Sequence, residues 1–240
     1  MSSHSSSQSQ DSYSPNVTSA EVVELFSLVR SASVIRPSDL IERLDARIEE
    51  IAQREGHSKG GIIAQVQDAE KVTLLHVAAQ HQREEVLEYY FLDTTFTNET
   101  NLRRCLLNAK TISNDGPIHL AARAHDTRFI RALVDRGVQI DSRGFFGCTA
   151  LHFVTRKTAS LSALWDLYGL GASLDVQNMS GQTPLHLAVM DGNVAVVGTL
   201  LQMGADAAIR NAGDLTPGVL ARNLPDGEVL RLFVERNLPH

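Results

Sequence analysis

A six-residue pattern occurs five times along the last two thirds of this 240-residue chain, and it limits the possible folds more than any other feature. The clearest copy reads Thr-Pro-Leu-His-Leu-Ala at 183–188, and looser copies lie at 73–78, 116–121, 149–154 and 216–221. Successive copies start 43, 33, 34 and 33 residues apart. A period this regular predicts a row of similar structural units, each of which is completed by its neighbours.

The copy that begins at Thr183 shows what one unit should look like. Thr183 and Pro184 are typical of a helix start, because the hydroxyl caps a free amide and proline has no amide to satisfy. Gly192 can end this helix with a positive φ. Apolar residues then recur at spacings of three and four up to Gly204, which predicts a second amphipathic helix. Helices this short are marginal alone, so the units must stack.

The other copies depart from this pattern at particular positions. His125 and Gln82 stand where the fourth copy has the glycine after its first helix. One extra residue within 155–160 must loop out between the two helices of the third copy. In the fifth copy Gly218 and Val219 replace leucine and histidine, as expected for a copy at the edge of a row.

The hexapeptide and its period near 33 resemble those of ankyrin-repeat proteins over residues 63–240. The resemblance implies an all-α solenoid of about five helix-turn-helix repeats. We place these repeats at about 69–112, 113–144, 145–178, 179–211 and 212–240. It also implies a protein that works by binding other macromolecules.

Two regions precede the repeats. Residues 1–19 are rich in serine and glutamine and have almost no apolar content, so we expect a disordered tail. Residues 20–62 should form a helical N-terminal cap, whose first helix starts with the capping-box pair Thr18 and Glu21. In the second helix, apolar residues step by three and four in the manner of a coiled coil: Ile41, Leu44, Ile48 and Ile51. A cap that shields the first repeat is the favoured interpretation, and a dimer seam is the alternative.

The interval between the first two copies is ten residues longer than the others, and the excess lies within 93–114. Leu102, Leu106 and Leu107 predict either a short amphipathic helix or a long finger there. Such an insertion is either an irregular structural loop or a docking element.

Composition excludes several classes of protein. The net charge is −6 and there is no basic run, which argues against direct nucleic-acid binding. Only Arg36 is basic within 31–40, so the basic helix that precedes a DNA-binding zipper is missing. No stretch is apolar enough to suggest a membrane span, and the N-terminus has no signal-peptide pattern. We therefore expect an intracellular protein of the cytoplasm or nucleus, without a membrane partner.

Four of the nine histidines occupy the fourth position of the hexapeptide: His76, His119, His152 and His186. The resemblance implies that these rings bond to backbone and threonine hydroxyl groups near each helix start. They belong to separate repeats, so they should not converge on a metal ion. No catalytic or phosphate-binding motif is present. The sequence predicts no enzyme activity, cofactor, metal or small-molecule substrate.

Residues without a structural task are the candidates for partner binding. The resemblance implies contact through the tips of the fingers between repeats and through the exposed side of each first helix. Phe145 and Phe146 put two aromatic rings at one such tip, where polar residues are usual. The candidates on the first helices are Arg123, His125, Arg156, Lys157, Met190 and Asp191. The basic members predict a positive patch that would suit an acidic segment of a partner.

The leading hypothesis is a non-catalytic protein-protein adaptor. Family resemblance suggests a transcription co-regulator, or an inhibitor of the kappa-B-inhibitor kind, that acts through a partner protein. The alternative is a regulatory or targeting subunit that docks on an enzyme such as a phosphatase or a ubiquitin ligase.

Overall fold

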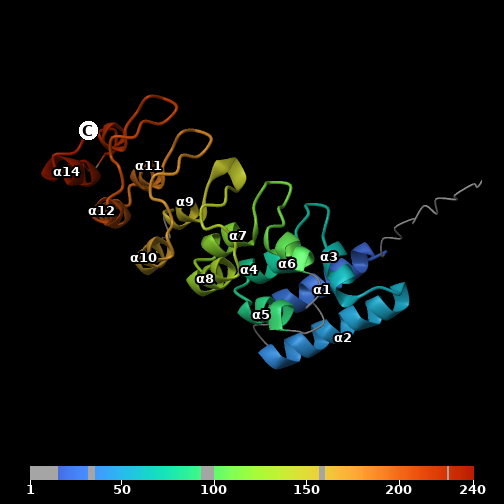
Figure 1. The fold of residues 1–240 in the computed structure, drawn as a ribbon. Helices are drawn as coiled ribbons and strands as arrows, with labels where there is room; N and C mark the ends of the chain where they lie inside the picture. Colours follow the sequence, from blue (N-terminus) through green and yellow to red (C-terminus); the bar gives the residue numbers. More distant parts are fainter. Residues whose placement is uncertain (1–15, 32–35, 93–99, 157–159, 226) are drawn as a thin grey trace, which may run out of the picture.

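The computed structural model describes residues 16–31, 36–92, 100–156, 160–225 and 227–240. Within these residues the chain forms fourteen α-helices and one short 3-10 turn. The β-structure of this described part is a single isolated bridge between Gln67 and Thr73. Figure 1 shows helix pairs stacked in an elongated row, with loops projecting along one side. The expected all-α solenoid is confirmed.

The helices form two parallel rows. The first-helix row consists of α1 (Ser19–Arg30), α4 (Leu74–Gln80), α7 (Pro117–Arg123), α9 (Ala150–Val154), α11 (Pro184–Met190) and α13 (Pro217–Ala221). The second-helix row consists of α2 (Pro37–Glu55), α5 (Glu84–Leu92), α8 (Thr127–Asp135), α10 (Leu161–Gly169), α12 (Val194–Met203) and α14 (Glu228–Glu235). The pairs from α4/α5 to α13/α14 are repeats 1 to 5.

Local chemistry sets the helix boundaries as expected. The Thr183 hydroxyl accepts a hydrogen bond from the His186 amide at the start of α11, and the Asn193 side chain caps α12 in the same way. After the first helix of repeats 1, 2 and 4, a left-handed residue turns the chain. This residue is Gln82 (φ 58°), His125 (φ 56°) and Gly192 (φ 66°) respectively. The position predicted from Gly192 is therefore conformationally the same in all three repeats.

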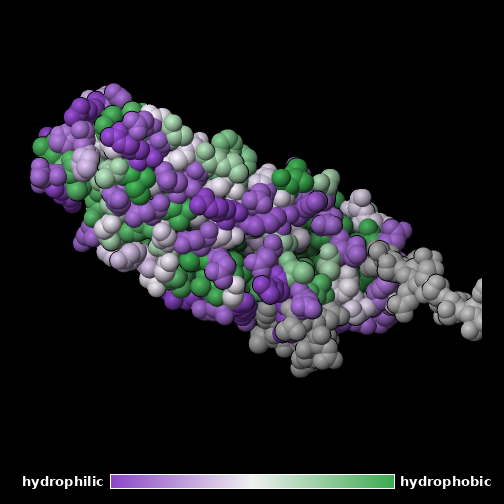
Figure 2. All heavy atoms as spheres, turned by 45° about the horizontal axis from the view of Figure 1, so that its top comes forward, coloured by the Kyte–Doolittle hydropathy of each residue, from purple (hydrophilic) through white to green (hydrophobic). Residues whose placement is uncertain are grey.

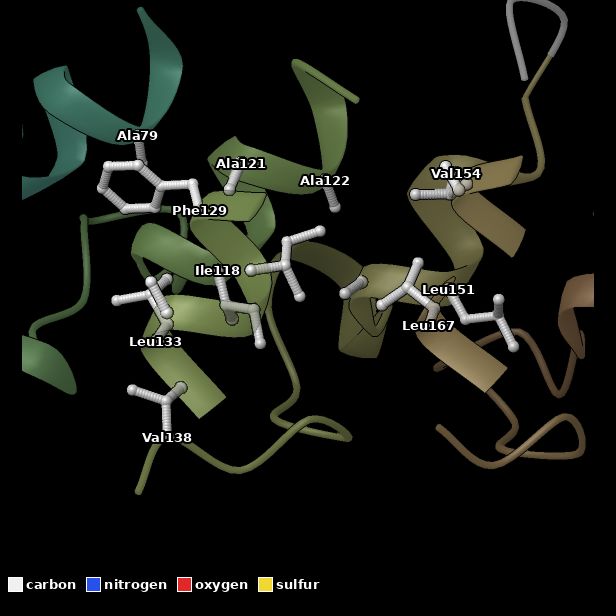
Figure 3. Close-up of a cluster of buried hydrophobic side chains, with 14 of the residues drawn as sticks. Ala79, Ile118, Ala121, Ala122, Phe129, Leu133, Val138, Leu151, Val154 and Leu167 are labelled. Atoms are coloured by element: carbon white, nitrogen blue, oxygen red, sulfur yellow. The ribbon is translucent and has the colours of Figure 1, made fainter. Parts of the chain in front are cut away.

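The core lies between the two rows. Figure 3 shows Phe129 of α8 reaching back to Ala79 of α4 and Ala121 of α7. Leu151 and Val154 of α9 and Leu167 of α10 continue the same layer into the next repeat. Alanines on the first helices allow this close approach, so each repeat buries its apolar face only against its neighbours.

The pair α1/α2 covers the open face of repeat 1, since α1 packs on α4 and α2 packs on α5. Leu44, Ile48 and Ile51 are fully buried inside the chain, so they are not the seam of a dimer. The Glu21 carboxylate of α1 forms an ion pair with the Arg54 guanidinium of α2, with Oε1 and Nη1 2.5 Å apart. That bond, together with the Thr18 cap, lowers the pKa of Glu21 to about 2. The predicted tail lies outside the described residues up to position 15, and α1 begins at Ser19.

The interval between repeats 1 and 2 contains α6 (Thr100–Leu107), which is the first of the two alternatives that the sequence left open. Leu107 is buried, and Leu102 and Leu106 pack against the core. Helix α6 also contacts α3 (Lys59–Gln65), which occupies the matching place before repeat 1. The insertion is a packed element of the fold.

Gly218 explains the departure of repeat 5 from the hexapeptide. A Cβ atom at this position would lie 2.1 Å from the Pro239 carbonyl oxygen, so no side chain fits. The Arg222 guanidinium holds the same segment by donating to the His240 carbonyl at 2.8 Å. The last residues of the chain thus lie against α13.

Candidate partner-binding site

A finger precedes the first helix of every repeat. The five fingers are closed by the same pair of backbone bonds, and we number them 1 to 5 for the spans 68–72, 111–115, 144–148, 178–182 and 211–215. In each, the fourth residue is left-handed: Lys71, Asn114, Gly147, Gly181 and Asp214. The tip of each finger therefore consists of the three residues inside the span.

Backbone hydrogen bonds join the tips of most neighbouring fingers. Ile112 donates to the Glu70 carbonyl, Met179 to that of Phe146, and Ala212 to that of Ser180, each at 2.9 Å. Between fingers 2 and 3 a side chain takes over, because the Phe145 amide donates to the Asp115 Oδ1 atom at 2.8 Å. Finger 3 is thus held differently from the others.

The two phenylalanines of finger 3 face outward. Phe145 is 47% exposed and Phe146 is 54% exposed, and their ring centroids lie 5.3 Å apart. Phe146 has a φ of 55°, which an aromatic residue rarely adopts. The segment η2 (Phe145–Gly147) stands out in Figure 2 as an apolar group among hydrophilic neighbours.

Adjacent tips extend this apolar surface on both sides. Met179 of finger 4 is 75% exposed and Ile112 of finger 2 is 65% exposed. We call Ile112, Phe145, Phe146 and Met179 the fingertip stripe. Sequence reasoning missed Ile112 and Met179, although both directly follow the first residue of a finger and could have been found by aligning the copies. Exposed apolar residues gathered on three neighbouring tips are typical of an interface.

Asp115 is the buried residue that bonds to the backbone of the fingertip stripe, at Phe145. Its side chain is 4% exposed, and its Oδ2 atom accepts the Arg123 guanidinium at 2.9 Å. Arg123 also lies 4.3 Å above the Phe153 ring. A Cβ atom at Gly144 would lie 2.5 Å from Asp115 Oδ1, so only glycine fits there. The sequence signal for Asp115 is weak, since the residue before the hexapeptide differs in every copy.

The charged candidates do not form a free positive patch. Arg123 pairs with Asp115, and Arg156 Nε lies 3.3 Å from the Asp191 carboxylate. Carboxylates of the chain already pair with these two arginines, which weakens the expected attraction for an acidic segment, and their role in partner binding stays a prediction. Lys157 lies outside the described residues.

The remaining candidates have different surroundings. Met190 is 53% exposed on α11, and its sulfur accepts from the Gln182 side-chain amide at 3.0 Å. His125 is half-buried, and its left-handed backbone is the turn that follows α7. Asp115 thus brings Phe145 and Arg123 together, whereas Arg156 and Asp191 form a separate pair.

The four hexapeptide histidines are buried and bonded in one manner. In His152, Nδ1 accepts from the Thr149 amide at 3.1 Å, and Nε2 lies 3.1 Å from the Gln182 carbonyl oxygen. An amide can only donate and a carbonyl can only accept, so the neutral ring carries its proton on Nε2. His76 and His186 repeat this arrangement with the Asp115 and Leu215 carbonyls. His119 instead donates to Ser142 at 2.8 Å.

These surroundings suppress protonation. Burial lowers the pKa of His76 and of His152 to about 4, and it lowers the pKa of His119 and His186 as well. A second proton would sit on Nδ1 and point at the backbone amide that already donates to it. The rings are structural bridges from one repeat to the next.

Two absences within the described residues concern other kinds of function. Over these residues, His, Cys, Asp and Glu side chains form no group of three that could hold a metal ion. Likewise, no helix within the described part of the chain is long and apolar enough to cross a membrane.

Known proteins share this architecture. The family model described as "Ankyrin repeats (3 copies)" matches residues 118–211. The chain is an ankyrin-repeat protein. It is similar to NF-kappa-B inhibitor alpha of Sus scrofa, with 30% identity over 56% of this chain and 42% of that protein. It is also similar to the B-cell lymphoma 3 protein homolog of Mus musculus, with 26% identity over 66% of this chain and 34% of that protein.

A third relative is named as a kinase. Tyrosine-protein kinase Shark of Drosophila melanogaster is 29% identical over 55% of this chain, but the match covers 14% of that kinase. This ankyrin-repeat chain spans less than half the length of each of these three relatives.

Proposed function

We propose that the chain is a non-catalytic adaptor that binds a partner protein through the fingertip stripe. The observation that carries the proposal is the set of four large apolar side chains on three adjacent tips, which the interior of the fold does not use. Fixed backbone positions hold these side chains in place, so binding them loses little conformational entropy. The pairing of Arg123 and Arg156 within the chain favours an apolar partner surface over an acidic one.

We further propose that the protein is a transcription regulator of the cytoplasm or nucleus that acts through its partner. The support is its similarity to NF-kappa-B inhibitor alpha and to the B-cell lymphoma 3 protein homolog. The net charge of −6 favours a protein partner over direct contact with nucleic acid. The chain carries no enzyme activity in this proposal, and it needs no cofactor.

The test is capture of partners by the immobilised chain, followed by mass spectrometry. The variant Phe145→Ser/Phe146→Ser removes the two rings, and Val234→Ser on the exposed face of α14 is the matched control. We expect the double variant to lose the captured protein while circular dichroism and the melting temperature stay nearly constant. Capture that is equal for all three forms would exclude the fingertip stripe.

The identity of the captured protein tests the finer proposal. Transcription factors would support the regulator, whereas phosphatase or ubiquitin-ligase subunits would point to a targeting subunit instead.

A further inference from the structure

The outward face of α10 carries a second group of exposed apolar side chains. Leu161, Trp165 and Tyr168 follow each other at spacings of four and three, which places them on one side of the helix. Each is more than two fifths exposed. The rings of Trp165 and Tyr168 meet edge to face with centroids 6.2 Å apart. Helix α10 belongs to the second-helix row, away from the fingers (Figure 1).

The equivalent positions on neighbouring helices show what is unusual here. The buried residues of α8, α10 and α12 follow one spacing, as Ile130, Leu164 and Val197 illustrate. Aligned in this way, Trp165 takes the place of Arg131 in α8, Gly198 in α12 and Arg231 in α14. The surface of α10 and α12 is thus an apolar strip between two charged helices.

Small and uncharged residues complete this α10–α12 strip: Ser162, Gly169, Ala195, Gly198, Thr199 and Gln202. The one charged residue on it is the half-buried Asp166. Because these side chains are short, the surface over α12 is recessed relative to the projecting rings of Trp165 and Tyr168. A helix can pack into a recessed surface that lies next to projecting aromatic side chains.

The size of the strip selects the kind of occupant. Helices of nine and ten residues are about 14–15 Å long. With axes about 10 Å apart, they offer an area on the order of 300 Å². A stable dimer needs about 800 Å² from each partner. A second copy would therefore have to cover the charged faces of α8 and α14 as well, whereas one short helix fits the strip alone.

The flanking charges select the chemistry of that helix. Arg128 and Arg131 are exposed on α8 beside the strip, and neither has an ion-pair partner within the described part of the chain. Asp135 lies a turn further along α8, so the positive end is the one near the start of α10. Acidic residues of an occupant would meet the two arginines at that end.

We propose that the α10–α12 strip binds one amphipathic helix of a partner protein. The apolar face of that helix covers Trp165 and Tyr168 and rests on Ala195 and Gly198. Its acidic residues face Arg128 and Arg131. This surface is separate from the fingertip stripe, so it stands or falls independently of the function proposed above.

The probe is a displayed library of 18-residue helix-forming peptides without tryptophan. It is selected on the full chain and counter-selected on Trp165→Ser/Tyr168→Ser. We expect enriched peptides with apolar residues at helical spacing and with acidic residues along one edge. Trp165 is the only tryptophan of the chain, so its emission should shift to shorter wavelength as such a peptide binds.

Affinities of the enriched peptides for variants locate the site. Trp165→Ser/Tyr168→Ser should weaken binding at least tenfold, whereas Phe145→Ser/Phe146→Ser should leave it unchanged. The charge reversal Arg128→Glu/Arg131→Glu should weaken acidic peptides and strengthen the same peptides with lysine in place of the acids. Circular dichroism of each variant verifies that the fold is intact.

Three results would overturn the proposal. One is a selection that enriches no peptide over the counter-selected variant. Another is that acidic peptides bind the charge-reversed variant as tightly as the native chain, which would exclude an acidic partner helix. The third is sedimentation of the native chain as a dimer that Trp165→Ser converts to a monomer, since the occupant would then be a second copy.

Discussion

The junction between repeats 2 and 3 differs from the junctions on its C-terminal side. In the junctions of repeats 3 and 4 and of repeats 4 and 5, the histidine bonds to the last residue of the next finger. A backbone bond also joins the two fingertips there. Between repeats 2 and 3, His119 reaches Ser142 instead, and Asp115 replaces the backbone acceptor. One junction is built with side chains where the others use the backbone.

The difference shows how a repeat can present an exposed aromatic pair without losing order. Finger 3 lacks the backbone hydrogen bond to the tip of finger 2, and its Phe146 has a left-handed backbone conformation. The buried Asp115, Arg123 and the Phe153 ring supply the missing support. A candidate binding surface thus coincides with the place where the regular pattern is broken.

Acid should have the largest effect, and it should act on both kinds of junction, because burial lowers the pKa of His119 as well as that of the regularly placed rings. The pKa of His76 and of His152 is about 4 in the fold, against about 6.5 in the unfolded chain. The unfolded state therefore binds more protons between these values, so stability is complete above pH 6.5 and falls as the pH drops toward 4. The loss is about 1.4 kcal/mol per pH unit for each ring. Urea titrations from pH 7.5 to 4.5 measure it, and a flat profile would contradict buried neutral rings.

Removing single histidines should separate the two kinds of junction. His152→Ala leaves the buried Thr149 amide without an acceptor and removes one of the two donors to the Gln182 carbonyl, which should cost about 3 kcal/mol. His119→Ala should cost about 1 kcal/mol less, because Gly116 has no hydroxyl to bond to that ring. Urea unfolding of both variants at pH 7.5 tests the order, and a larger loss for His119→Ala would reverse our interpretation of the irregular junction.

Asp115 should matter only at the irregular junction. Asp115→Ala removes the acceptor of the Phe145 amide and the partner of Arg123, with an expected loss of about 2 kcal/mol. Asp115→Asn keeps an acceptor oxygen and should lose less than about 1 kcal/mol. Hydrogen exchange at the Phe145 amide is the direct measurement. It should accelerate in Asp115→Ala, and an unaltered rate there would show that the carboxylate does not hold finger 3.

The smallest effect concerns the backbone of Phe146. Asparagine tolerates a left-handed φ better than phenylalanine does, so Phe146→Asn should stabilise the fold by about 0.5 kcal/mol. Partner capture should fall in the same variant. The control is Phe145→Asn, which offers no such relief because φ is positive only at Phe146 and Gly147 of this tip. A loss of stability in Phe146→Asn would mean that the ring also packs on its neighbours.

The sequence was sufficient to predict features set within one repeat. Thr183 and Pro184 marked the start of α11, and Gly192 marked the left-handed turn after it, whereas Gln82 and His125 looked like departures in the sequence although their backbone is the same. The leucines of 102–107 left a short amphipathic helix and a long finger open, and the structure has the helix, α6. Half of the fingertip stripe was visible as Phe145 and Phe146.

Contacts between side chains that meet only when the repeats stack were not predictable. Arg123 looked free in the sequence, because its partners Asp115 and Phe153 meet it only after the fingers have stacked. The paired state of Arg156 depends in the same way on the position of α11. The left-handed backbone at Phe146 had no signal either, since glycine follows it and is the expected site of a positive φ.

The buried imidazoles also give the array a polarity, because His76, His152 and His186 each donate from their own repeat to the finger of the next one along the chain. Truncation from the N-terminal side would leave a carbonyl without its donor, which a protein tolerates more readily. Truncation from the C-terminal side would remove the acceptor of a ring N–H together with the neighbour that covers the ring, so that repeat loses both the bond and its packing. Shortened forms of this molecule should therefore keep their order better when repeats are removed from the front.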